Sequence, residues 1–301
     1  LMMGLSAQDS NIQAFFATAE ATMQWPWPGD RPSFVFSGDQ VGPDQEALLR
    51  NVYPQAYTAT ARDQINQQSL IKSYANPLLM ALLLSVICDK LNNMVDLAVG
   101  SLDQNGKDAI KQGIVALRNH VANLDSGDRF VKSFIDQTSR MMTMFRDGSA
   151  GAMPRRYNPL TTTPLHQIVG DQNIPSSGLT EVAVVAGLIG LGIENGLWML
   201  GSIDPSNPSD GVVRISTAAA STKMVLAAHG RAAIQNGHIA DDEDAVLVYS
   251  SERPPMTTRS PRSSPGRTGH LGLREVSIFD LLQVATSVDD LLQHFREEAA
   301  I

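Results

Sequence analysis

The residues best placed to do chemistry in this sequence are five arginines in a segment with few apolar side chains, residues 250–274. Those arginines, set against one acidic residue and giving a local charge of +4, are Arg253, Arg259, Arg262, Arg267 and Arg274. Serine, threonine, glycine and proline separate them, which keeps the backbone extended and lets each guanidinium reach a different phosphate or carboxylate. We therefore expect this basic arm to bind nucleic acid or an acidic neighbouring subunit.

A second and weaker basic set lies near the middle of the chain. It consists of Arg140, Arg146, Arg155 and Arg156. For the basic arm itself, two other interpretations stay open. One is a mobile surface loop, and the other is a linker phosphorylated at Ser260 and Ser264, each of which is followed by proline.

Three short patterns resemble catalytic or nucleotide-binding motifs, and each fails in its details. Gly100–Asp108 resembles a phosphate-binding loop, but it has one residue too many between its glycines and lacks the hydroxyl that would hold magnesium. Gly187–Gly196 has the wrong glycine spacing for a dinucleotide loop and is better explained by glycines in a packed helix. Ser69–Lys72 matches a Ser-x-x-Lys pattern without any companion motif.

The metal-binding and nucleophilic side chains also form no recognisable site. Cys88 is the only cysteine and falls in a strongly apolar helix, so we expect a buried structural thiol. The six histidines are scattered, and no two have the spacing of a helical metal pair. The acidic run 241–244 lacks the alternation of a calcium loop and predicts a solvated turn. We expect no cofactor, no metal and no enzymatic activity, although a catalytic site assembled from scattered residues stays open.

An aromatic pair near the amino terminus is a candidate partner contact. Trp25 and Trp27 alternate with prolines, which favours a polyproline conformation able to bind another chain. The alternative is that both indoles fill a groove of their own fold.

The overall composition narrows the class of partners. The net charge is -8, so nucleic-acid binding would have to be local to a basic segment. Charged residues make up only 18%, which favours a surface that contacts other proteins. A single cysteine fits a reducing compartment, and residues 1–20 show no signal-peptide pattern. We expect an intracellular, cytoplasmic location or one within a virion, and no membrane association.

The elements that would position these residues are mostly helices. Helical periodicity and capping residues predict a bundle over residues 1–147, with the apolar run 78–88 in its middle. Residues 148–177 are rich in Gly, Pro, Thr and Ser and predict a connector. Residues 178–301 predict a second helical lobe that carries the basic arm.

Inside that second lobe, residues 178–201 predict a buried helix whose glycines allow close packing. Residues 212–216 and 245–249 predict a pair of strands, and the Ala-rich stretch 217–236 predicts a helix between them. Two helices close the chain, the last one capped by Ser287.

Together these features predict a mainly α protein with two lobes and a small β element. The function they favour is non-enzymatic self-assembly, as in an RNA-binding coat, capsid or nucleocapsid subunit whose partners are copies of itself or other assembly subunits. A helical adaptor in a heteromeric complex is the alternative.

Overall fold

The computed structural model shows a mainly helical protein with a small five-stranded sheet, in agreement with the predicted fold class. The residues that the structure describes are 10–22, 40–52, 54, 57–68, 75–98, 102–122, 132, 134, 135, 138, 160–200, 212–218, 221–227, 245–253 and 273–301.

The chain forms two compact units, residues 1–79 and residues 80–301. The first contains α1 (Ser10–Thr22), α2 (Pro43–Val52) and α3 (Ala61–Gln68). Among its described residues, the buried apolar cluster consists of Val41, Leu49 and Tyr57. The predicted connector 148–177 is described only from Leu160 onward, so the two-lobe division stays a prediction.

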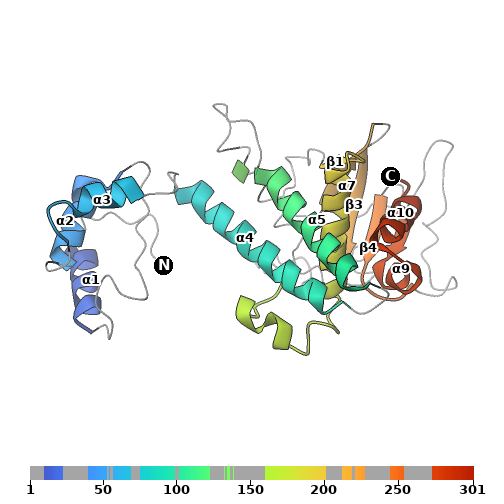
Figure 1. Ribbon diagram of the computed structural model, residues 1–301, viewed down its shortest axis with the longest axis horizontal. Coiled ribbons are helices and arrows are strands. Elements are labelled where there is room, and N and C mark those ends of the chain that lie inside the picture. The colour runs from blue at the N-terminus through green and yellow to red at the C-terminus, as the bar shows by residue number, and fades with distance from the viewer. Residues whose placement is uncertain are drawn as a thin grey trace. The chain divides into compact units, whose positions relative to one another are not determined.

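The second unit is built on a close pair of helices, α5 (Gln104–Ala122) and α7 (Leu179–Glu194), which lie side by side in Figure 1. Glycines permit the approach. A Cβ on Gly190 would lie 1.7 Å from the carbonyl oxygen of Gly113, and one on Gly113 would lie 2.1 Å from that of Gly187. The prediction that the α7 glycines serve packing is thus confirmed for Gly187 and Gly190. These two helices, one from each side of the predicted connector, share a single core.

The sheet has the order β1-β2-β3-β4-β5. Its strands are β1 (Met199–Leu200), β2 (Val212–Ser216), β3 (Ser221–Ala227), β4 (Ala245–Tyr249) and β5 (Leu273–Ser277). The first three strands are antiparallel, whereas β3, β4 and β5 are parallel. The parallel strands therefore end together, at Ala227, Tyr249 and Ser277.

Two predictions about this region are wrong in part. Residues 245–249 are a strand as predicted, but they pair with β3 and β5 rather than with β2. Residues 221–227, expected to lie in an Ala-rich helix, form β3. In β3, Met224 belongs to the core shared with the helices, while Val225 belongs to the cluster on the other face. Alternate burial in a strand paired on both sides outweighs the weak helical preference of the sequence.

Helices α9 (Ile278–Val284) and α10 (Val288–Ala299) follow β5 and contribute to the same core as α5 and α7. The sequence of α10 predicts one apolar face formed by Val288, Leu291, Leu292, Phe295 and Ala299, and the last four are buried while Val288 is half-buried. Ser287 caps the helix as predicted, accepting a hydrogen bond from the Asp290 amide at 3.1 Å.

Candidate functional site

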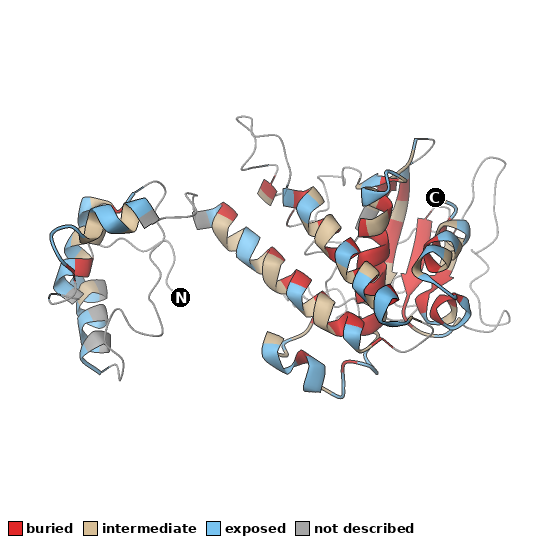
Figure 2. Ribbon diagram, viewed as in Figure 1, coloured by how far each residue is buried: buried red, intermediate tan, exposed pale blue. Residues whose placement is uncertain are grey.

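Helix α4 (Ala75–Asp96) has a partly exposed apolar half, which differs from the prediction that it lies in the middle of a bundle. Figure 2 shows α4 banded in red, tan and blue, whereas α7 is mostly red. The core side of α4 is the stripe formed by Leu84, Ile87, Cys88, Leu91, Met94 and Val95.

The opposite face of α4 changes character along its length. Leu82 is 51% exposed, and its neighbours one turn away on the same face, Leu78 and Val86, are half-buried. Farther along, the same face carries exposed Asp89 and Asp96. A solvated helix face is normally polar throughout. The apolar half of this face is therefore a candidate contact surface, which we call the α4 apolar stripe: Leu78, Leu82 and Val86.

By length and composition alone, residues 76–96 of α4 are the one described segment that could cross a membrane. A mostly buried core helix passes the same test, and 33% of the apolar window of this segment is buried in the structure.

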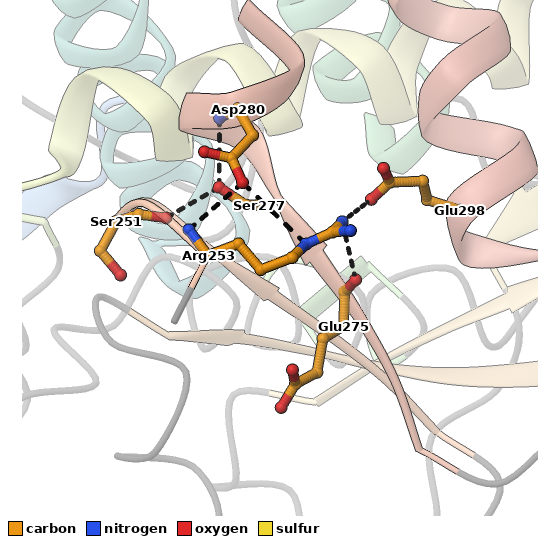
Figure 3. Close-up of polar contacts among 6 residues, drawn as sticks. All are labelled: Ser251, Arg253, Glu275, Ser277, Asp280 and Glu298. Carbon is orange, nitrogen blue, oxygen red and sulfur yellow. Dashed lines mark hydrogen bonds and ion pairs between the residues drawn. The ribbon is translucent and has the colours of Figure 1, made fainter. Parts of the chain in front are cut away.

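The second candidate site is a polar cluster at the ends of β4 and β5, drawn in Figure 3. Its centre is Arg253, which follows β4. The guanidinium forms an ion pair with Glu298 of α10 and donates to the backbone carbonyl of Glu275 in β5 at 3.4 Å. The Arg253 amide donates to the carboxylate of Asp280, in the first turn of α9, at 3.2 Å. One residue thus ties the end of β4 to β5, α9 and α10.

The electrostatics of this cluster suit a structural tether. Burial acts to lower the pKa of Arg253, but the Glu298 carboxylate and Tyr249 outweigh it, so the pKa lies above its ordinary value. The side chains of Arg253 and Glu298 are 30% and 32% exposed, which leaves the pair only partly screened by water. The guanidinium pairs with Glu298, lies 4.0 Å from the Asp280 carboxylate and donates to one backbone carbonyl, so its contacts are made inside the chain.

Two serines complete the hydrogen bonding of the cluster. Ser277 accepts a hydrogen bond from the Asp280 amide at 3.1 Å, capping α9, and donates to the carbonyl of Ser251 at 2.8 Å. Its hydroxyl proton is therefore committed to the backbone. Nucleophilic catalysis would need a general base on that hydroxyl, and the contacts of Ser277 supply none.

Among the arginines predicted to bind nucleic acid or a subunit, the structure describes two. Arg253 is the centre of the cluster above. Arg274 lies in β5 rather than in an irregular arm, and its guanidinium donates to the carbonyls of Ala299 and Ala300 at the end of α10. Both make contacts inside the chain. The others, and the predicted partner contacts, lie outside the described residues: Arg259, Arg262, Arg267, Arg140, Arg146, Arg155, Arg156, Trp25 and Trp27.

The structure also shows the surroundings of residues from the incomplete motifs and of the candidate nucleophile and metal ligands. Lys107, which would be the phosphate lysine, donates to the carbonyl of Asp96 at 3.0 Å. Cys88 is fully buried, and burial raises the pKa of its thiol to about 12, as expected for a structural cysteine. In the described part of the chain, no group of three or more His, Cys, Asp or Glu side chains could hold a metal ion.

Sequence reasoning missed most of the residues that surround Arg253. The Ser277-x-x-Asp280 spacing is a helix-start signal and could have been found. Glu298 is 45 residues from Arg253, and no local pattern joins them.

No protein-family model, curated protein or solved structure matches this chain significantly.

Proposed function

We propose that this chain is a non-enzymatic structural protein that assembles with copies of itself, as a subunit of a coat, capsid or nucleocapsid does. The observation that carries the proposal is the α4 apolar stripe, because a leucine that is 51% exposed lies between two half-buried apolar residues on one helix face. Contiguous exposed apolar patches mark interaction sites, and three apolar side chains on successive turns of one helix face are a candidate for such a patch.

The energetic argument favours coverage of the stripe by another protein surface. Complete burial of one leucine side chain is worth about 1.5–3 kcal/mol relative to its exposed state. In an assembly of several subunits, each subunit would cover the stripe of a neighbour. Many weak contacts of this kind together stabilise the assembly. The predicted two-lobe organisation and the intracellular or virion location belong to this same proposal.

Light scattering coupled to size-exclusion chromatography tests the proposal on the full chain. We expect a mass that rises with concentration to multiples of 32.5 kDa. Leu82→Glu places a charge in the stripe and should shift the protein toward monomer. Val169→Glu is the matched control, because Val169 is 59% exposed in the separate 3-10 turn η1 (Leu165–Gly170) and should leave the mass unchanged.

The result also separates this proposal from the alternative of a helical adaptor. An adaptor would keep its stripe for a different protein and would stay monomeric alone at every concentration. That outcome would refute self-assembly and favour the adaptor.

Nucleic-acid binding is the accompanying proposal for the basic arm, and it rests on the sequence. Because Arg253 and Arg274 already make contacts inside the chain, the arginines that remain for phosphate are Arg259, Arg262 and Arg267. Three phosphate contacts to single-stranded RNA predict a log–log salt slope of about -2. Binding that is insensitive to salt, or unchanged when these three become alanine, would contradict this proposal.

A further inference from the structure

We propose that Asn195–Gly196 is a site of spontaneous covalent modification, at which the side-chain amide of Asn195 is lost and an isoaspartate enters the backbone. The sequence contains three Asn-Gly pairs, and the structure describes two of them, Asn105–Gly106 and Asn195–Gly196. Glycine after asparagine favours the reaction, because it has no Cβ to hinder its own amide nitrogen. The local structure around each pair then decides which one reacts.

The reaction starts when the backbone nitrogen of Gly196 attacks the side-chain carbonyl carbon of Asn195. The new C–N bond closes a succinimide ring, the bond to the side-chain nitrogen breaks, and ammonia leaves with the proton of the Gly196 amide. Water then opens the ring at one of its two carbonyl carbons. Opening at the former side-chain carbon gives aspartate. Opening at the backbone carbon gives isoaspartate, in which the chain runs through the side chain.

Asn195 and Gly196 form the exposed end of α7. Both residues are exposed, and a Cβ on Gly196 would meet nothing within 4 Å. The Gly196 amide donates to the carbonyl of Ile193 at 3.0 Å, and the Leu197 amide donates to that of Gly192 at 2.8 Å. With Gly196 at a φ of 67°, these two bonds make a Schellman cap. The rotation that brings the attacking nitrogen to the side chain disturbs this terminal turn, and helix ends open more readily than packed segments.

The other described pair is held by the fold. Asn105 is exposed, but Gly106 is buried in the first turn of α5, where an added Cβ would lie 3.3 Å from a methyl group of Val288 in α10. The Gly106 amide donates to the carboxylate of Asp103 at 2.8 Å. The same rotation at this pair would break that bond and move Gly106 within a packed contact. We therefore expect Asn195 to react faster than Asn105 in the folded protein.

The modification site lies just before the residue that holds the end of α7 in the core. The buried Trp198 indole donates to the carbonyl of Ile189 at 2.9 Å, and a Cβ on Gly192 would lie 1.9 Å from its ring. Isoaspartate lengthens the backbone between α7 and Trp198 by one carbon. Its carboxylate also adds a negative charge at the carboxyl end of the helix, where the helix dipole disfavours it. The modification therefore loosens Trp198 from the core.

Peptide mapping by mass spectrometry, after incubation of the full chain at mildly alkaline pH, follows the mass gain at each asparagine. We expect Asn195 to deamidate at least about tenfold faster than Asn105 in the native protein, because a helix end opens more often than a packed turn. In urea the two pairs should react at similar rates, since the fold then holds neither. Equal native rates, or a slower reaction at Asn195, would overturn the proposal.

Two variants separate the backbone change from the added charge. Asn195→Gln should stay unmodified at this position, because glutamine would have to close a larger ring, and Asn195→Asp carries the charge on a normal backbone. In a Trp25→Phe/Trp27→Phe background, Trp198 is the only tryptophan. Its emission should shift to longer wavelength as the chain ages and stay in place in Asn195→Gln. The same shift in fresh Asn195→Asp would overturn the argument from the backbone, and deamidation of Asn195 without any shift would overturn the coupling to Trp198.

Discussion

The glycine contact between α5 and α7 predicts that replacing Gly190 with alanine destabilises the protein. Helix propensity alone predicts the opposite effect. In the interior of a helix, alanine is more stable than glycine by about 1 kcal/mol. Gly190 lies in the interior of α7, so propensity alone predicts that Gly190→Ala stabilises the protein. The structure predicts the reverse.

The magnitude follows from the distance between the two helices. The new Cβ would lie 1.7 Å from the carbonyl oxygen of Gly113, and ordinary van der Waals contact begins at 3.4 Å. The atom in the way belongs to a helix backbone and cannot rotate aside, so the helices must separate. A gap of 0.5–1 Å already forfeits about a quarter to a half of each contact energy across the interface.

Overpacking of this kind costs about 1–3 kcal/mol and more where the backbone must move. After the gain in helix propensity, we expect Gly190→Ala to lower the free energy of unfolding by about 2 kcal/mol. For a domain of this size, such a loss lowers the melting temperature by roughly 4–8 °C.

Thermal unfolding followed by circular dichroism, at one fixed protein concentration, measures the effect. Gly170→Ala is the matched control, because a Cβ at Gly170 meets nothing within 4 Å, and its melting temperature should change by less than about 2 °C. A melting temperature for Gly190→Ala equal to or above that of the unmodified protein would refute the close approach of the two helices.

Three further predictions concern the tether, a helix cap and the thiol. A double-mutant cycle with Arg253→Gln and Glu298→Gln should give a coupling energy of about 1 kcal/mol in urea unfolding, because the pair is only partly exposed. Ser287→Ala removes the acceptor of the Asp290 amide and should cost about 1 kcal/mol of unfolding free energy in the same assay. Cys88 should resist a thiol reagent at pH 8 in the native protein and react once urea unfolds it, since burial raises its pKa to about 12.

A control tests the first of these predictions, and a contrary result is defined for the third. The same cycle on Arg50 and Glu46, whose arginine side chain is 57% exposed, should give less than about 0.5 kcal/mol. Equal coupling in the two cycles would show that burial adds nothing to the Arg253 pair. Native labelling of Cys88 as fast as that of a small thiol would place it outside the core.

Features set by neighbouring residues were predictable from the sequence. The cap and apolar stripe of α10 lie within one short segment, and the long apolar run of α7 indicates a buried helix by itself. Partners distant in the sequence were not predictable. Gly113 packs against α7 from the other side of the predicted connector, and β3 is a strand because β2 and β4 pair with it on either side.

The basic arm is the clearest case in which residues predicted to bind a partner instead make contacts within the chain. In the sequence, Arg253 and Arg274 belong to the same basic segment as the three arginines between them. In the structure, both bind groups near the end of α10, one through the Glu298 carboxylate and the other through the last carbonyls of the helix. A helix end is a favourable site for a cation, so the fold stabilises these two charges internally. The two ends of the arm are thereby fixed to the same helix terminus. The exposed apolar half of α4 is a separate surface, and its proposed contact does not depend on charge.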